Sequence, residues 1–420
     1  MASDTKTDRF QRKRQQVLDA ASRLVIDRGV KGLTFVDVAK AMDLNTTSVT
    51  YYFKRKDMLA CAVFEETMRR LCERFQTALT RYDTPRDRVR GLIDNFFDFH
   101  ANVRAGRESP VASLADLRAM EGPYRLQLNE SYKAMFRLLR RVFGAPNDDK
   151  AHSLYTARTH VLLENIFWMS AWMNRYSTGD YERLSKRLFE VMDRGIVPAQ
   201  TPLRVSTLNI PEIESRVADD VMPQNFVRAA TVLMNERGYR GASVERIASE
   251  LNVTKGSFYH HLEAKEDLAL ECFGRSYSFV SLVQREAQAV PGTHWEKLNL
   301  AISTLLYVQF FHEFPLLRTT ALSALPPEVK PGVLARSNRM ARRFAGMMID
   351  GITEGSVHTI DPLVVSQAMM AMLNAAYDLR GWAVKQSQDD AIKFYASTLV
   401  YGLFDDEAVL GSGSAASQPY

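Results

Sequence analysis

Apolar residues recur at intervals of three and four positions along most of the 420-residue chain. This spacing is typical of amphipathic helices, because one helical turn takes 3.6 residues. Alternation of apolar and polar residues, which would indicate strands, is absent over any useful length. The pattern therefore predicts an all-α protein, and a chain of this length is expected to form more than one domain.

The stretch from Val17 to Tyr52 predicts three helices. Gly29 and Gly32 would end the first helix, whose inward face carries Val17, Ala20, Ala21, Leu24 and Val25. Thr34 can cap the second helix, and Asn45 can cap a third that runs to about Tyr52. Two short helices joined by a tight turn and braced by a first helix make a helix-turn-helix.

The same pattern returns 209 residues later without a gap. Identical residues at this offset are Ala20 and Ala229, Ala21 and Ala230, Leu24 and Leu233, Arg28 and Arg237, Gly29 and Gly238, Gly32 and Gly241, Ala39 and Ala248, Ser48 and Ser257, Lys56 and Lys265, and Leu59 and Leu268. In the second copy Ser243 and Thr254 are the expected caps. A unit of about 200 residues is therefore duplicated, which differs from a short-period solenoid.

The segment "VPAQTPLRVSTLNIP" contains three prolines and no helical apolar period, so it is expected to link the copies. The final "GSGSAASQPY" has the composition of a disordered tail. The predicted organisation is a first helix-turn-helix domain at 1–60, a first helical regulatory domain at 61–197, a linker at 198–222, a second helix-turn-helix domain at 223–270, a second helical regulatory domain at 271–406 and a disordered tail at 407–420.

A helix-turn-helix places the exposed face of its last helix in the DNA major groove, where hydroxyl, Lys, Tyr and His side chains reach base edges and phosphates. In the first copy this face carries Thr46, Thr47, Ser48, Thr50 and Tyr51. In the second it carries Lys255, Gly256, Ser257, Tyr259 and His260. Three-helix packing also occurs in proteins that bind no DNA, so the pattern alone leaves that alternative open.

The second copy, with "AATVLMNERGYRGASVERIASEL" followed by "VTKGSFYHHLEAKEDL", resembles the N-terminal signature of the tetracycline-repressor (TetR/AcrR) family of bacterial transcription regulators. The resemblance implies a DNA-binding module joined to a helical domain that binds a small molecule and dimerises, in a repressor released by its ligand. The resemblance also implies that a set of residues in this motif contacts DNA: Thr254, Lys255, Gly256, Ser257, Tyr259, His260, His261 and Lys265. Further candidates are the cap positions Thr34 and Ser243 and the first-copy residues Tyr52 and Lys56.

The two copies differ in their motif and in their charge. The first has Thr46, Thr47 and Thr50 where the family usually has Lys, Gly and Tyr, so its base preference is expected to differ. Residues 1–60 hold twelve basic and seven acidic side chains, whereas residues 216–270 hold seven and eight. The basic arm with Arg12, Lys13 and Arg14 should help the first copy hold phosphates. We expect both copies to bind DNA; the alternative is that one, more readily the second, has lost DNA contact and serves as an interaction module.

Two segments are apolar on more than one helical face: "RTHVLLENIFWMSAWMN" and "VVSQAMMAMLNAAYDLRGW". One face would serve the core of its own domain, and the other would meet a partner helix. In the family, the last two helices form a four-helix dimer interface. Because this chain already holds two units, the simplest assembly is a single-chain pseudodimer on an asymmetric double-stranded operator, with half-sites roughly one helical turn apart. A dimer of chains is the alternative.

The resemblance also implies a pocket for a small effector, which the composition suggests is apolar or aromatic. Candidate lining residues are Phe96, Phe97, Phe99, Tyr132, Phe136 and Trp168 in the first copy, and Tyr307, Phe310, Phe311 and Tyr377 in the second. Each could equally be ordinary aromatic core. Ligand-independent regulation is a further alternative.

No catalytic or metal-binding motif is found, so no enzyme activity, cofactor or metal is expected. The net charge of +5 permits nucleic-acid binding without requiring it. The N-terminal residues lack the apolar region of a secretory signal, and no apolar stretch approaches the roughly 18 residues of a membrane span. Three cysteines cannot form an even disulfide framework. A cytoplasmic protein is therefore expected.

Overall fold

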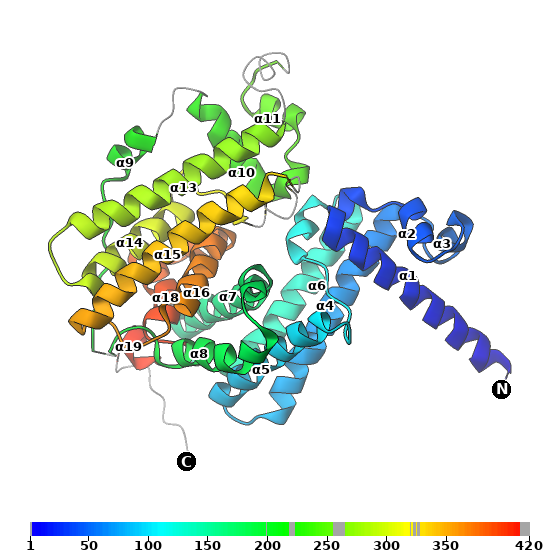
Figure 1. Cartoon of the computed structure of the whole chain (residues 1–420), viewed down its shortest axis with the longest axis horizontal. Helices are drawn as coiled ribbons and strands as arrows, with labels where there is room; N and C mark the ends of the chain where they lie inside the picture. The colour runs from blue at the N-terminus through cyan, green and yellow to red at the C-terminus, as the bar shows by residue number, and fades with distance from the viewer. Residues whose placement is uncertain are drawn as a thin grey trace.

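The computed structural model describes residues 2–411 except 199, 218–222, 255–264, 320, 322–324 and 326–327. Every regular element in these ranges is a helix (Figure 1), which confirms the all-α fold class. In the same ranges, no helix combines the length and apolar character that crossing a membrane requires.

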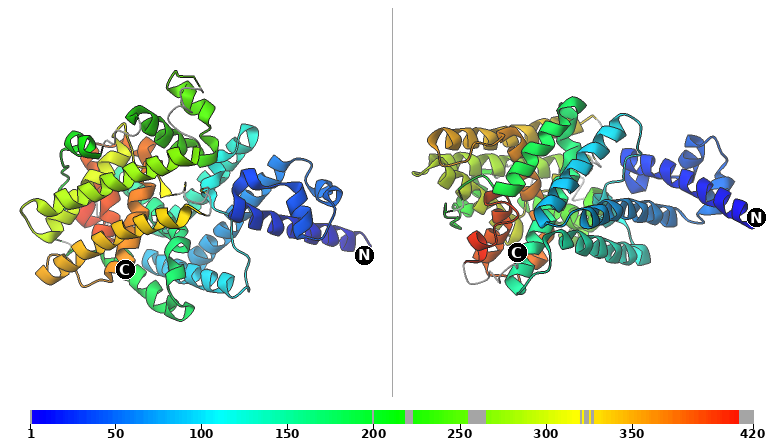
Figure 2. Two further views of the ribbon diagram at one scale, coloured as in Figure 1. Left: turned by 45° about the horizontal axis from the view of Figure 1, so that its top comes forward. Right: turned by 90° about the horizontal axis from the view of Figure 1, so that it is seen from below.

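The first unit begins with three helices that project from the rest of the molecule (Figures 1 and 2). These are α1 (Ala2–Gly32), α2 (Phe35–Ala41) and α3 (Thr46–Tyr52). The body of this unit consists of α4 (Lys56–Arg81), α5 (Pro85–Arg104), η1 (Leu114–Ala119), α6 (Gly122–Arg140), α7 (Asp149–Trp172) and α8 (Tyr181–Arg194).

The second unit repeats this order. Its front contains α10 (Gln224–Gly241) and α11 (Val244–Glu250). Its body consists of α13 (Lys265–Ala289), α14 (His294–Phe310), α15 (Lys330–Glu354), α16 (Pro362–Ala375), η6 (Ala376–Leu379), α17 (Arg380–Ala383) and α18 (Gln388–Val400).

The offset of 209 extends beyond the helix-turn-helix segments into the bodies. Adding it to the bounds of α4 gives 265–290, where α13 lies, and adding it to those of α5 gives 294–313, where α14 lies. Backbone conformations also match: Asp43 and Asn252 have φ values of 52° and 53°. Both residue types tolerate this left-handed region better than most, so the turn that follows α2 has the same form as the turn that follows α11.

The segment between the units is more ordered than the predicted linker. Ile210–Val217 forms α9, with Ile213 buried, and α9 packs against α13. The preceding residues lie along α14, where Asn299 Nδ2 donates to Arg204 O at 2.6 Å and Leu208 N donates to Thr304 Oγ1 at 3.0 Å. The prolines prevent a long helix in this segment. Its backbone groups are therefore available to bond with side chains of α14.

The predicted disordered tail begins too early. Glu407–Leu410 forms the short helix α19, and Val409 within it is buried. Asp405 and Asp406 precede this helix, and the Asp405 carboxylate accepts the backbone N–H of Ala408 at 2.9 Å. An acidic residue that caps a helix and an apolar residue that packs against the body together order this segment.

The bodies of the two units pack directly against each other. Helix α7 contacts α16 and α18, and α8 contacts α16 and, more lightly, α18. Val161 and Leu162 are adjacent on α7, about 100° apart around the axis, and both are buried. Ala368 and Met369 on α16 are buried in the same way. The prediction that these helices are covered on more than one face is confirmed.

Backbone hydrogen bonds join the ends of α8 and α18. Ile196 N donates to Val400 O at 3.0 Å, and Leu403 N donates to Met192 O at 2.7 Å. Gly195 lies between them with φ 70°, and a Cβ there would come within 2.1 Å of Val400 O. The close approach of the two chain segments therefore depends on glycine at this position.

Replacing Gly195 with Ala should lower the free energy of unfolding by more than about 2 kcal/mol. Gly195 combines φ 70° with ψ −165°, a conformation essentially restricted to glycine that costs an L-residue about 1 to 3 kcal/mol, and the new Cβ must also displace the Val400 carbonyl. Gly106→Ala is the matched control, because Gly106 has φ 69° and nothing within 4 Å of its Cβ position. Denaturant unfolding of the two variants measures the difference, and equal losses would contradict the packing argument.

Candidate nucleic-acid interface

Helix α3 presents a polar outer face because its one buried residue, Val49, points toward the core. The Asn45 side chain accepts the backbone N–H of Ser48 at 2.9 Å and thereby caps the helix as predicted. Thr46 and Thr47 are exposed, and 64% of Tyr51 is accessible. These three side chains are free to reach a groove.

The N-terminal half of α1 is held beside α3 by aromatic contacts. The Phe10 ring lies 5.9 Å from that of Tyr51 and 5.0 Å from that of Tyr52. The Arg14 guanidinium lies 5.0 Å from the centre of the Phe53 ring. Sequence reasoning missed Phe10, although a single aromatic residue within a basic arm is a detectable signal.

The basic arm therefore runs alongside the exposed face of α3. Arg12 and Lys13 are exposed on α1. Flexible cations next to a helix that enters a groove can neutralise the flanking phosphates, which contribute most of the affinity. The arrangement brings together the basic arm and the exposed hydroxyl groups that the sequence predicted.

Other predicted contact residues of the first module have local partners. Thr34 caps α2 by accepting the backbone N–H of Asp37 at 3.0 Å, which confirms the predicted cap. Ser48 Oγ donates to Asn45 Oδ1 at 2.8 Å, and Thr50 Oγ1 donates to Thr47 O at 3.0 Å. Lys56 is half-buried at the start of α4. These side chains organise the module in addition to any contact that they make with DNA.

The second module is described only in part. Ser243 caps α11, as predicted, and Thr254 is exposed after the turn. The Lys265 ammonium donates to Tyr239 O and lies 4.3 Å from the centre of the Tyr239 ring. The remaining predicted contact residues lie outside the described residues: Lys255, Gly256, Ser257, Tyr259, His260 and His261.

The described helices of the second module, α10 and α11, lie against the bodies of both units, whereas the first module projects (Figure 2). Helix α10 packs against η1 of the first unit. Arg246 on α11 pairs with Glu121, just before α6, at 2.9 Å. On the other side, the buried Asn235 side chain donates to Leu316 O at 2.9 Å and accepts Arg318 N at 2.9 Å. Its position is therefore coupled to how the two units pack.

A charged cluster lies at the junction between the units. Asp378 on η6 pairs with Arg118 on η1 at 2.7 Å and also with the buried Arg318. Burial tends to raise the pKa of the Asp378 carboxyl, but the two guanidinium groups outweigh it and lower that pKa. Glu164 on α7 faces the same groups. Burial raises the pKa of Glu164 to about 7; the two arginines oppose this rise and Asp378 adds to it.

His160 belongs to the same cluster. Its ring is buried, with Nδ1 2.9 Å from the Tyr395 hydroxyl, and burial lowers the pKa of His160 to about 4. His160, Glu164 and Asp378 each offer one atom that could hold a metal ion, and these atoms lie within 4.8 Å of one another. However, the carboxylate of Asp378 is held by two guanidinium groups whose charge opposes a cation there. The cluster is better suited to joining the units than to binding metal.

The predicted effector-pocket residues fall into separate groups. Phe96, Phe97 and Phe99 are buried in the core of the first unit, while Tyr132, Phe136 and Trp168 are partly buried. In the second unit, Phe310 packs 5.2 Å from the Tyr395 ring, with Tyr307, Phe311 and Tyr377 partly buried nearby. Neither of the two hollows found beside α13 in the described structure is lined by any of them. Their ligand-binding role stays a prediction.

The projecting three-helix module, with its capped polar helix and basic arm, has the architecture of a helix-turn-helix. The family model of the tetR family of bacterial regulatory proteins matches residues 17–63 and again residues 226–272. Both helix-turn-helix segments of the chain therefore match the model of this family, which supports a tandem duplication.

Individual relatives match parts of the chain. The Transposon Tn10 TetC protein of Escherichia coli is 40% identical over 50 residues, which cover 12% of this chain and 25% of TetC. The HTH-type transcriptional repressor DhaR of Mycobacterium sp. (strain GP1) is 29% identical over 140 residues, which cover 32% of this chain and 69% of DhaR. The solved structure of the TetR family transcriptional regulator PfmR from Thermus thermophilus is 19% identical, covering 42% of this chain and 98% of PfmR, with a TM-score of 0.34.

The raised pKa of Glu164 predicts a pH dependence of stability. Between its ordinary pKa of 4.5 and about 7, the folded protein holds a proton that the unfolded chain has released. The stability that this proton contributes is therefore present at low pH and is lost as pH rises through 7. Relative to Glu164→Gln, the free energy of unfolding of the unmodified protein should fall by up to about 3 kcal/mol between pH 5 and 8.

Denaturant unfolding of both proteins across this pH range measures the difference. The glutamine variant is the matched control, since it keeps the shape of the side chain and removes its titration. A difference that is independent of pH, or one that grows in favour of the unmodified protein as pH rises, would contradict a carboxyl held protonated by burial.

Proposed function

We propose that the chain acts as a single-chain pseudodimer that binds an asymmetric DNA site with two unlike modules. The observation that carries this proposal is the packing of α7 and α8 against α16 and α18 within one chain. Helices of two copies usually provide such an interface in this family. Here the second copy of the unit is already tethered, which favours pairing within the chain over pairing between chains.

Buried polar contacts make the two bodies difficult to separate. Arg158 on α7, only 1% exposed, pairs with Asp406, and Tyr155 donates to the same carboxylate at 3.0 Å. Trp168 Nε1 donates to Gln367 Oε1 at 3.3 Å. Removing the Asp406 carboxylate would leave the buried Arg158 guanidinium without its partner, and such a loss typically costs about 3 to 5 kcal/mol.

The two modules are proposed to read different base sequences. The first offers Thr46, Thr47 and Tyr51 on α3, whereas the sequence of the second offers Lys255, Gly256 and His260 at the corresponding positions. Hydroxyls, ammonium groups and imidazoles favour different base edges. An operator with unlike halves follows from this difference.

A small apolar or aromatic effector is proposed to release the protein from DNA. The aromatic residues in the bodies support an apolar ligand, and one similar protein, DhaR, is named a repressor. The docking of α10 against η1 offers a route for coupling, because a ligand that shifts one body relative to the other would move the second module.

A second candidate function is that only the first module binds DNA while the second serves as an interaction module. Its docked position, the Arg246–Glu121 pair and the internal use of Lys265 favour this reading. The near-neutral charge of residues 216–270 also favours it, since phosphate contacts dominate affinity.

Selection of bound sequences from a random DNA pool tests both candidates. The intact chain should select a non-palindromic site of two parts. Tyr51→Ala should lose one part and Tyr259→Ala the other, each with roughly a tenfold loss of affinity from a removed contact. Leu126→Ala, an exposed position on α6 at 70%, should change neither.

A site that is unaffected by Tyr259→Ala but lost with Tyr51→Ala would favour the second candidate over the first. If the selected site is palindromic as well, then two chains bring their first modules together, and the pseudodimer proposal is wrong.

The mass of the complex gives an independent prediction. Light scattering after size exclusion should find a free protein of 47.6 kDa, the mass of one chain, and one chain per selected DNA duplex. Two chains per duplex with a symmetric footprint would contradict binding as a single-chain pseudodimer.

A further inference from the structure

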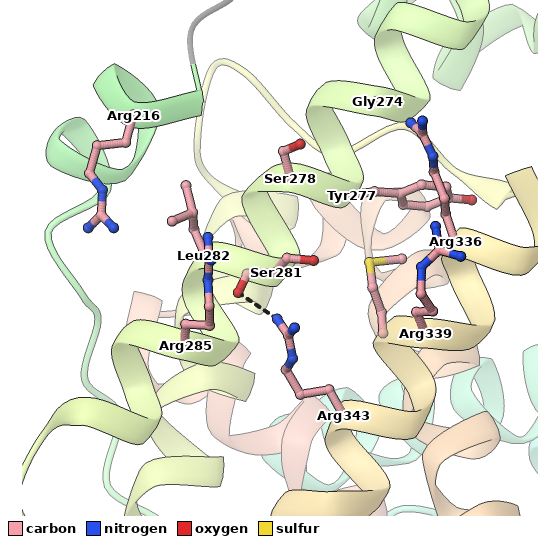
Figure 3. Close-up of a pocket in the computed structure, with 11 residues that line it drawn as sticks. Arg216, Gly274, Tyr277, Ser278, Ser281, Leu282, Arg285, Arg336, Arg339 and Arg343 are labelled. Atoms are coloured by element: carbon pink, nitrogen blue, oxygen red, sulfur yellow. Dashed lines mark hydrogen bonds between the residues drawn. The ribbon is translucent and has the colours of Figure 1, made fainter.

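Five arginine side chains surround one hollow on the outer face of the second unit (Figure 3). The hollow has a volume of about 640 Å³ and lies between α13 and α15, with α9 at its edge. Its arginines are Arg216 on α9, Arg285 on α13, and Arg336, Arg339 and Arg343 on α15. We refer to it as the arginine groove.

The charge of the arginine groove is only partly compensated. Among the described residues that line it, none carries a carboxylate. Arg216 pairs with Glu286 at 2.8 Å, and Arg343 donates to Ser281 O at 3.1 Å. Within the described part of the chain, Arg285, Arg336 and Arg339 have no ion pair. Like charges gathered in this way repel one another, and a bound anion would relieve that repulsion.

The first unit provides an internal comparison. At the offset of 209, Gly274 and Arg336 correspond to Glu65 and Gln127, and the Gln127 amide donates to the Glu65 carboxylate. Arg339 corresponds to Glu130, which pairs with Lys133 at 2.7 Å. At these positions the first unit therefore has a hydrogen bond between α4 and α6 and an ion pair within α6, in place of unpaired arginines. The arginine groove belongs to the second unit and does not follow from the fold alone.

The arginine groove also offers space and an apolar surface beside its charged side chains. Three small residues of α13, Gly274, Ser278 and Ser281, line the groove together with Leu282 and Met340. A Cβ at Gly274 would have only the Arg336 Nη1 atom nearby, at 3.9 Å. The floor of the groove can therefore cover a flat or apolar group while the guanidinium groups bind an anion.

We propose that the arginine groove binds a small molecule with two or more phosphate groups and an attached ring, the chemistry of a nucleoside polyphosphate. Guanidinium groups form bidentate hydrogen bonds to phosphate oxygens. A volume of about 640 Å³ lies within the range of roughly 300 to 1,000 Å³ that is typical of small-molecule sites. The expected effector pocket of Tyr307, Phe310, Phe311 and Tyr377 is lined by other residues, so this is a second site.

A small molecule fits the arginine groove better than a DNA backbone does. The arginines converge on one hollow from three helices, whereas contacts to a duplex are spread along a surface that follows the phosphates. DNA contact is therefore an alternative outcome of the test.

Binding there would also reach the second module. Helix α9 precedes this module in the chain, and α13 follows it directly. A polyanion bound by Arg216, Arg285 and Arg336 would therefore link α9 and α13, the helices on either side of the module in the chain, to α15. This regulatory consequence rests on the proposed function, whereas binding itself does not.

Isothermal titration calorimetry of the intact chain without DNA tests the site directly, with ATP, inorganic pyrophosphate and adenosine as probes. We expect ATP to bind one site per chain, pyrophosphate to bind more weakly and adenosine not to bind. The double variant Arg336→Ala, Arg339→Ala should weaken ATP binding at least tenfold. Arg342→Ala is the matched control, because Arg342 is an exposed arginine of the same helix outside the groove.

Three outcomes would overturn the proposal. The first is that neither ATP nor pyrophosphate binds at millimolar concentration. The second is that Arg342→Ala weakens ATP binding as much as the double variant does. The third is that the double variant loses affinity for DNA while its affinity for ATP is unchanged. The last would assign the arginines to DNA. Because the titration contains no DNA, its result stands whether or not the two-module mode of DNA binding is correct.

Discussion

The structure depends most on the burial of charged and polar side chains between the two bodies. Arg158 pairs with Asp406, and Asp378 is held between Arg118 and Arg318. Groups of this kind are costly to bury alone and become tolerable only when their partners are in place. Arg158 and Arg118 come from the first unit and their carboxylates from the second, so the pairs that cross the junction require both bodies in place.

This dependence extends to the second helix-turn-helix module. The Arg318 backbone N–H binds the Asn235 side chain of α10, while the Arg318 guanidinium binds Asp378 at the junction. One residue therefore connects the module to the charged cluster that joins the bodies. A change in the charge of that cluster, for example ionisation of Glu164, acts on groups that also hold the module in place.

Local features were predictable from the sequence because their causes are local. Thr34, Asn45 and Ser243 cap the helices at which they were expected, since a cap needs only its own side chain and the next turn. The offset of 209 found in the helix-turn-helix segments also located α13 and α14. In contrast, Asp406 and Phe10 gain their partners only through packing. Asp406 lies at the edge of the predicted tail, and no spacing rule connects it with Arg158.

Joining both copies in one chain permits differences that a homodimer cannot have. In a symmetric dimer every substitution appears twice, so a basic arm or an arginine groove on one subunit is repeated on the other. Here Glu65 and Gln127 bind each other in the first unit, while Gly274 and Arg336 leave the matching face open in the second. The shared interface constrains the faces that α7 and α16 bury, and the outer faces of the two units are free to diverge toward separate roles.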